Sequence, residues 1–180
     1  MRRLAVAFVA ILGASALGAC GRVAGEVVPL AGDLTLEEAR TFEEFPLVYA
    51  GEQVDGLPLV AIVRRDDTAD YVSFVYGDCL PSSPEGGCAP PAEIQVWPAA
   101  RRSLGAYAGT QGAGASAPVL TSIRGSLAAF FDDGTRLELY TAELTLVLFA
   151  RSPERLRTIV GALRCVAEDR AHDPAGRLDC

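Results

Sequence analysis

The chain contains no lysine and no asparagine among its 180 residues, so arginine supplies all 16 of its basic side chains. Its formal net charge at pH 7 is −7. Nucleic-acid-binding domains use basic patches to neutralise phosphates, and anionic membrane surfaces attract helices rich in Lys and Arg. The charge balance therefore argues against a nucleic-acid partner, and against membrane binding through the charge of the folded domain.

Histidine is scarce as well, because His172 is the only one and lies in a polar C-terminal stretch. A Ser-His-Asp triad, a Cys-His pair or a typical zinc site needs imidazole beside other reactive or ligating groups. The sequence also lacks a G-x-S-x-G elbow, a P-loop and the C-x-x-C spacing of redox enzymes. We therefore expect no catalytic residues, no metal site and no cofactor.

Long hydrophobic runs are missing too, with one exception at the N-terminus. Arg2 and Arg3 precede Leu4–Leu17, an uncharged run of 14 residues. This length suits the h-region of a signal peptide, whereas a transmembrane helix needs about 20 apolar residues. Residues 1–19 are therefore expected to be a signal peptide.

The run ends in the sequence LGAC at residues 17–20, which resembles the lipobox of bacterial lipoproteins. In that family the cysteine receives a diacylglyceryl group and becomes the first residue, and two acyl chains suffice for stable anchoring. The resemblance implies that Cys20 is lipidated and holds the chain at the extracytoplasmic face of the cell membrane. Ordinary secretion, with cleavage after residues 14–16, is the alternative, and it would leave Cys20 as an unpaired fifth thiol.

The remaining chain divides into three parts. Residues 20–33 have small side chains and no clear period, which is typical of a tether. The 13 residues after Cys20 span at most about 45 Å, so the tether keeps the domain near its membrane. Residues 34–166 are expected to form one α+β domain, and residues 167–180 a polar C-terminal tail.

Strand patterns dominate the domain and form two groups. The first group ends at Pro98, an Ala/Gly/Ser-rich connection covers residues 99–118, and the second group begins near Ile123. Each group has an Asp-Asp turn after its first strand, and a change of apolar parity predicts a turn or bulge at residues 142–143. We expect an antiparallel sheet of about six strands in two meanders. The expected strands are residues 57–65, 71–77, 93–97, 126–131, 136–141 and 144–150.

Two helices are expected around the sheet. The T-x-x-E spacing of residues 35–38 is a capping box, which predicts a short helix to about Glu44. Ser152 and Pro153 supply the N-cap and first residue of a C-terminal helix. Its apolar side chains recur at i, i+3, i+4 and i+7, so it is expected to cover one face of the sheet. These side chains belong to Leu156, Ile159, Val160 and Leu163.

Four cysteines remain once Cys20 is assigned to the lipid: Cys79, Cys88, Cys165 and Cys180. An even number in an exported domain predicts two disulfides, for which three pairings exist. The favoured bridge is Cys79–Cys88, because prolines and glycines between them can turn the chain back. If the last helix extends to Cys165, that residue points away from the core, where the tail can bring Cys180 to it.

Acidic and aromatic side chains are the remaining candidates for a functional site. Two carboxylates at a suitable separation catalyse glycoside hydrolysis, but acidic residues at turns and helix ends have local structural roles. Likewise, aromatic side chains in strands pack in cores more often than they line ligand grooves. The carboxylates are Glu43, Glu44, Asp66, Asp67, Asp70, Asp78, Asp132 and Asp133, and the aromatic residues are Tyr71, Phe74, Tyr76 and Trp97.

The mature domain resembles lipoproteins of high-GC bacteria without an assigned activity, through the stretches VSFVYGDC, GGCAPP, DDGTRLELYT and LVLFA. This resemblance implies no reaction. We expect a membrane-anchored, extracytoplasmic and non-enzymatic module that binds an envelope protein or a small ligand. The alternative is a carboxylate-dependent hydrolase that acts on envelope polymers.

Overall fold

The computed structural model describes residues 31–79, 88–104, 117–167, 178 and 180. The signal peptide, Cys20, most of the expected tether and His172 lie outside these residues. The helices and strands are β1 (Ala31–Gly32), α1 (Leu36–Arg40), β2 (Val48–Tyr49), β3 (Gln53–Val54), β4 (Leu57–Arg65), β5 (Tyr71–Tyr76), β6 (Ala92–Pro98), β7 (Val119–Ile123), β8 (Ser126–Phe131), the 3-10 turn η1 (Asp132–Gly134), β9 (Arg136–Tyr140), β10 (Leu144–Ala150), α3 (Pro153–Ala162) and β11 (Arg164–Cys165).

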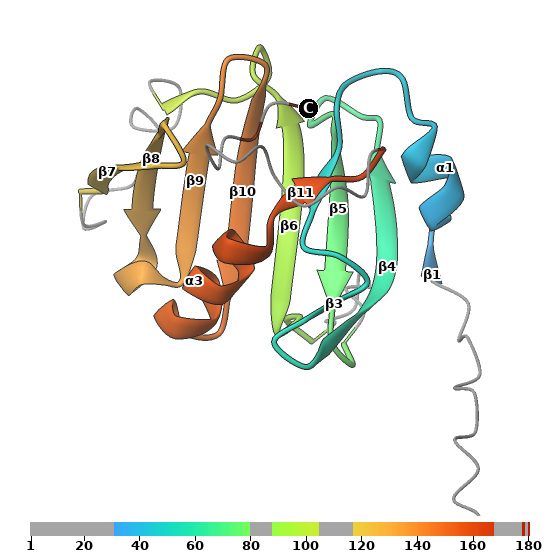
Figure 1. Ribbon diagram of the computed structural model, residues 1–180. Coiled ribbons are helices and arrows are strands. Elements are labelled where there is room, and N and C mark those ends of the chain that lie inside the picture. Colours follow the sequence, from blue (N-terminus) through green and yellow to red (C-terminus); the bar gives the residue numbers. More distant parts are fainter. Residues whose placement is uncertain (1–30, 80–87, 105–116, 168–177, 179) are drawn as a thin grey trace, which may run out of the picture.

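One mostly antiparallel sheet forms the body of the protein, so the α+β class expected from the sequence is confirmed. Eight strands follow one another in the order β1-β4-β5-β6-β10-β9-β8-β7, and β3 pairs in addition with β4. The two meanders meet through their last strands, β6 and β10 (Figure 1). The expectation of about six strands is wrong, because β1 and β7 extend the sheet at its two edges.

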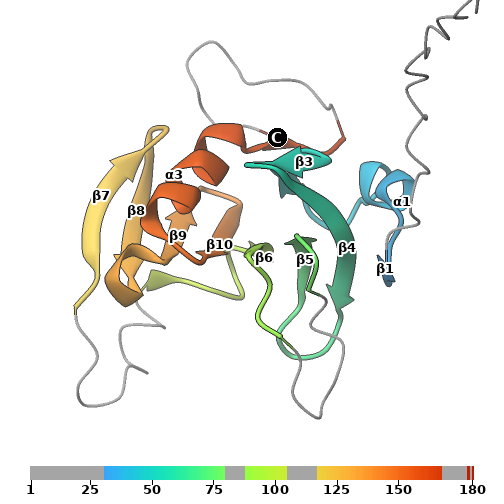
Figure 2. The same ribbon diagram turned by 90° about the horizontal axis from the view of Figure 1, so that it is seen from below.

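The face of the sheet that α3 covers is called the inner face. Figure 2 shows the sheet curving around α3. A row of directly paired apolar residues crosses this face, and its side chains are buried except for the last two, Phe130 and Val119, near the β7 edge. The row consists of Ile62, Phe74, Ile94, Leu148, Leu137, Phe130 and Val119.

The C-terminal helix α3 packs on the inner face of the sheet and completes the core. Leu156, Ile159 and Leu163 are fully buried, whereas Val160 is partly exposed. At about 1.5–3 kcal/mol for each fully buried side chain, this stripe makes α3 integral to the fold. The helix ends at Ala162, and Cys165 lies in β11, where it pairs with Val48. The helix therefore does not extend to Cys165, and the position expected for a longer helix does not apply.

The N-terminal helix has the expected start but a different end. The Thr35 hydroxyl accepts a bond from the Glu38 N–H at 3.2 Å, and Glu38 Oε2 accepts one from the Thr35 N–H at 2.7 Å. The helix ends at Arg40 instead of about Glu44. Its last turn is closed early because the Thr41 N–H and hydroxyl both donate to the carbonyls of Glu37 and Glu38.

Two disulfides join the cysteines favoured from the sequence. Cys79 bonds to Cys88 with a Cα–Cα distance of 5.9 Å, and Cys165 bonds to Cys180 at 5.6 Å. The first bridge ties the ends of the loop between β5 and β6. The second ties the C-terminal residue to β11, so the chain end is fixed to the domain.

Candidate functional site

The face of the sheet away from α3, called the outer face, carries a ladder of polar side chains. Along β6, the Trp97 indole donates to Gln95 Oε1 at 3.2 Å, and Gln95 donates to Glu93 Oε1 at 2.9 Å. The Ser73 hydroxyl of β5 donates to the same Glu93 oxygen at 2.6 Å. The period-two alternation of the strands places these groups together, and they satisfy one another.

A buried ion pair extends this polar face across β9. The Glu138 side chain is 0 % exposed, and the guanidinium of Arg102 holds it through both Nε and Nη2. The Tyr140 hydroxyl donates to Glu138 at 2.7 Å. Burial and this bond to a carboxylate raise the pKa of Tyr140 well above its ordinary value. Glu138 therefore has a structural partner for its charge, and Tyr140 stays protonated.

The segment after β6 crosses the outer face and places Arg102 beside Glu138. The Thr145 hydroxyl donates to the backbone carbonyl of Arg102 at 2.8 Å, and the Ala99 N–H donates to the Glu143 carbonyl at 2.9 Å. The sequence did not reveal this contact. Glu138 alternates with two leucines and looks solvent-facing, and Arg102 lies in a stretch that resembles a plain connection.

The four aromatic candidates separate into two pairs. Phe74 and Tyr76 are fully buried on the inner face, and the Tyr76 hydroxyl donates to the Gly51 carbonyl at 3.1 Å. Tyr71 and Trp97 stack on each other on the outer face, with ring centroids 4.4 Å apart. Arg102 also lies 5.2 Å from the Trp97 ring centroid. These contacts indicate packing roles for all four, and they do not form a groove together.

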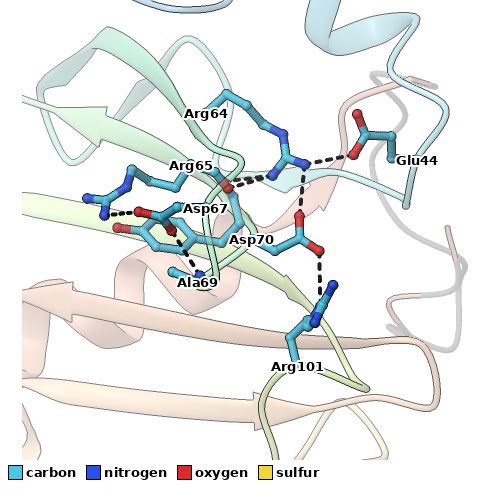
Figure 3. A network of polar contacts seen from close by, with 8 residues as sticks. Glu44, Arg64, Arg65, Asp67, Ala69, Asp70 and Arg101 are labelled. Carbon is cyan, nitrogen blue, oxygen red and sulfur yellow. Dashed lines mark hydrogen bonds and ion pairs between the residues drawn. The ribbon is translucent and has the colours of Figure 1, made fainter.

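Arg64, near the end of β4, joins the acidic turn between β4 and β5 to the segment after α1 (Figure 3). Arg64 Nη2 bonds to Glu44 at 2.7 Å and to Asp70 at 2.8 Å, and Nη1 donates to two backbone carbonyls of the turn. Arg101 also reaches Asp70, at 3.3 Å. The network joins the segment after α1, the β4–β5 turn and the segment after β6, so its role is to hold three parts of the fold together.

The same contacts set the protonation of the turn. The hydrogen bond from Arg64 lowers the pKa of Asp70, and the bonds from Arg65 and the Ala69 N–H lower the pKa of Asp67. Both groups therefore remain ionised under conditions in which a general acid must hold a proton. The sequence indicated these carboxylates but not their arginine partners, Arg64 for Asp70 and Arg65 for Asp67.

The other carboxylate candidates lie at the surface. Asp132 forms an ion pair with Arg136 at 3.4 Å at the η1 turn, and Asp133 there has a left-handed φ of 54°. Glu43, Asp66 and Asp78 are exposed. Within the described part of the chain, no three Asp, Glu, His or Cys residues are grouped in a way that could hold a metal ion.

The edge strand β7 carries exposed apolar side chains, in contrast to the polar side chains of the outer face. Among the described residues, β7 pairs with β8 alone. The three large hydrophobic side chains exposed in the described ranges all belong to this hairpin: Val119 at 67 %, Leu120 at 54 % and Leu127 at 45 %. An exposed apolar edge strand without charge or proline is a ready site for pairing with another strand.

The hairpin is held firmly to the domain by its turn. Arg124 and Gly125 form a two-residue turn with φ of 53° and 77°, as in type I′ hairpins. Arg124 donates to the Leu163 carbonyl at 2.9 Å and to the Gly161 carbonyl at 3.3 Å. A cation at the C-terminal end of α3 is favoured by the helix dipole. The turn therefore fixes the orientation of β7.

A cavity of about 400 Å³ opens between the start of β7, the η1 turn and the start of α3. Val119, Phe130 and Pro153 form its apolar walls, and Asp133 and Arg157 its charged walls. This mixed lining does not select one class of ligand. Its position matters more, because the cavity adjoins the exposed edge of the sheet.

Comparison of the chain with models of protein families, with curated proteins and with solved structures found no match. Among the residues that the structure describes, no helix is long and apolar enough to cross a membrane. The functional interpretation therefore depends on the geometry of the molecule itself.

Proposed function

We propose that the chain is a lipid-anchored, extracytoplasmic protein that binds a partner and catalyses no reaction. The observation that carries the binding role is the hairpin of the edge strand β7 with β8, which holds all the large hydrophobic side chains that are exposed among the described residues. Small domains rarely leave such an edge open, because it pairs with other chains.

The proposed anchor is Cys20 in the lipobox-like sequence at residues 17–20. The sheet already begins at Ala31, so only the ten residues from 21 to 30 lie between the proposed acyl chains and the domain. Ten extended residues span at most about 36 Å. Such a short connection enters the sheet at β1, at the edge opposite β7, and keeps the whole domain near the membrane, where its partner is expected.

The acidic side chains support a structural role more than catalysis. The buried carboxylate Glu138 is held by Arg102, and Asp70 is held by Arg64. Every described carboxyl group whose pKa departs from its ordinary value has it lowered, whereas a general acid needs it raised. This pattern favours the binding module over the carboxylate-dependent hydrolase.

The anchor is tested by intact mass spectrometry of membrane extracts, with Cys20→Ser as the matched variant. We expect a mature chain that starts at Cys20 and carries a diacylglyceryl group, and a Cys20→Ser protein that leaves the membrane fraction. An unmodified Cys20, or a mature chain that starts elsewhere, contradicts the anchor.

The binding role is tested by adding one positive charge at either end of the sheet. Ser122→Lys places it on the exposed edge, and Thr68→Lys places it on the exposed β4–β5 turn. Chemical crosslinking in native membranes is expected to lose its products with Ser122→Lys and to keep them with Thr68→Lys. Equal products from both variants contradict a binding role for β7.

A further inference from the structure

We propose that the partner of β7 is β7 of a second copy, joined by antiparallel pairing about a two-fold axis at Thr121. This inference deepens the proposed binding function and rests on it. It names the partner, the register and the side chains that meet.

The backbone of the edge strand determines which groups are available. Ile123 and Ser126 close the two-residue turn, and such a closing pair exchanges both of its backbone hydrogen bonds. Hydrogen bonds alternate along an antiparallel ladder, so the N–H and C=O groups of Leu120 and Ser122 point away from β8. A partner strand must therefore bond to these two residues.

One symmetric register satisfies all of these groups. With Thr121 opposite Thr121 of the second copy, Leu120 lies opposite Ser122 of that copy, and the converse holds by symmetry. Each Leu120–Ser122 pair exchanges two backbone bonds, which gives four bonds across the interface. Pro118 lacks an N–H and precedes β7, so the pairing ends there without an unsatisfied donor.

The same register covers the exposed apolar side chains. On the outer face Ser122 lies directly beside Leu127, so Leu120 of the second copy meets Leu127 across a small serine. On the inner face Val119 lies opposite Ile123 of the second copy. Val119, Leu120 and Leu127 are the three large hydrophobic side chains exposed in the described residues, and a single pairing buries them together.

The distribution of charge indicates where on the surface two copies can approach each other. The chain carries a net charge of −7, so two copies repel each other over most of their surfaces. Residues 117–131 contain no acidic side chain and one basic one, Arg124, which is bound to the end of α3. The hairpin is therefore the place where two copies approach with the least repulsion.

The size of the contact predicts a weak dimer in solution. A pair of five-residue strands is smaller than a standard interface of about 1,600 Å². Attachment of both copies to one membrane raises their effective concentration, which strengthens a weak contact without adding to it. We therefore expect pairing to be more complete on membranes than in dilute solution.

The register is tested by disulfide crosslinking of the full chain in native membranes. Thr121→Cys faces itself across the axis, whereas Leu120→Cys lies diagonal to itself, at about 7–8 Å. Under mild oxidation we expect at least ten times more homodimer from Thr121→Cys, and crosslinking between Leu120→Cys and Ser122→Cys when they are mixed. Equal yields from the two single variants overturn the register.

A third variant separates pairing from folding. Leu120→Pro removes an N–H that points away from β8, so the domain is expected to fold with an unchanged melting temperature. Sedimentation of this variant and of the parent chain is expected to show at least a tenfold rise in the dimer dissociation constant. If Leu120→Pro does not fold, Ser122→Lys provides the same measurement. An unchanged dissociation constant overturns the proposal.

Two outcomes distinguish this inference from the function on which it rests. If the Thr121→Cys variant crosslinks to a different protein and not to its own copy, self-pairing is wrong while the binding module stands. If the chain proves to be unlipidated yet the Thr121→Cys variant still forms its homodimer at high concentration, the anchor is wrong while the pairing stands.

Discussion

The two edges of the sheet differ in how far other parts of the chain cover them. At one edge β1 pairs in parallel with β4, β3 pairs with the start of β4, and α1 lies beyond β1 (Figures 1 and 2). At the other edge, within the described residues, no further strand pairs with β7. Proteins protect sheet edges from pairing with other chains, so the unprotected edge is the one with a binding role.

The covered edge is secured by specific polar contacts. The Asp33 and Leu34 N–H groups both donate to the Ile62 carbonyl, at 2.9 and 3.2 Å, and the Arg64 N–H donates to the Asp33 carboxylate. The exposed edge is held to the domain by its turn, through the bonds from Arg124 to the end of α3. The difference predicts that substitutions at the covered edge cost folding stability, whereas those at β7 cost association.

The largest effect is expected for Arg64→Ala. This change removes a side chain that is 14 % exposed and whose guanidinium holds Glu44, Asp70 and two backbone carbonyls. We expect a loss of about 3 kcal/mol in the free energy of unfolding, measured by urea titration, because the partly buried Asp70 carboxylate and two backbone carbonyls lose their partner. The control is Arg65→Ala, whose solvent-exposed pair with Asp67 is expected to contribute little to stability. Equal losses from both variants contradict the network.

A second prediction compares one glycine from each edge. Gly32 and Gly125 both have positive φ, 109° and 77°. A Cβ on Gly32 overlaps the backbone carbonyl of Ile62, whereas a Cβ on Gly125 meets nothing within 4 Å. Gly32→Ala is therefore expected to cost about 2–3 kcal/mol, and Gly125→Ala about 1 kcal/mol from backbone strain alone. Thermal unfolding measures both, and a larger loss from Gly125→Ala reverses the comparison.

The smallest effect is expected for Asp70→Asn, and it depends on pH. The pKa of Asp70 is lowered in the folded protein, so its contribution to stability is present above the unfolded value of about 3.9 and is lost as pH falls through the lower folded pKa. Asp70→Asn, which also tolerates the left-handed φ of 51° here, is expected to cost about 1 kcal/mol at pH 7. This cost is expected to vanish toward pH 2 in unfolding titrations. A difference that stays constant with pH contradicts the assignment.

Several parts of the fold follow from local sequence signals. The capping box at Thr35, the N-cap at Ser152 and the turn at residues 132–134 each depend on side chains within a few residues of one another. The apolar pattern of the sequence likewise predicted six of the seven strands that have five or more residues. Cysteine parity predicted two disulfides, and the prolines and glycines between Cys79 and Cys88 favoured the pairing that the structure contains.

The missed features depend on contacts between distant residues. β1 and β3 have two residues each, so neither shows a pattern, and β7 follows a stretch that resembles a connection. Arg64 and the Arg102–Glu138 pair were missed for a related reason. From the sequence alone, a charged residue in a strand is expected to face solvent. Only the fold shows which segment covers it.

The sequence by itself determined most of the secondary structure, the acidic charge, the parity of the cysteines and the lipobox-like segment, because each depends on neighbouring residues or on composition. Only the tertiary structure decided that β6 pairs with β10, and therefore that β4 and β7 stand toward opposite ends of the strand order. Pairing between distant strands depends on how whole faces pack together, which no local period specifies. The open edge, and with it the surface we expect to bind, comes from that packing.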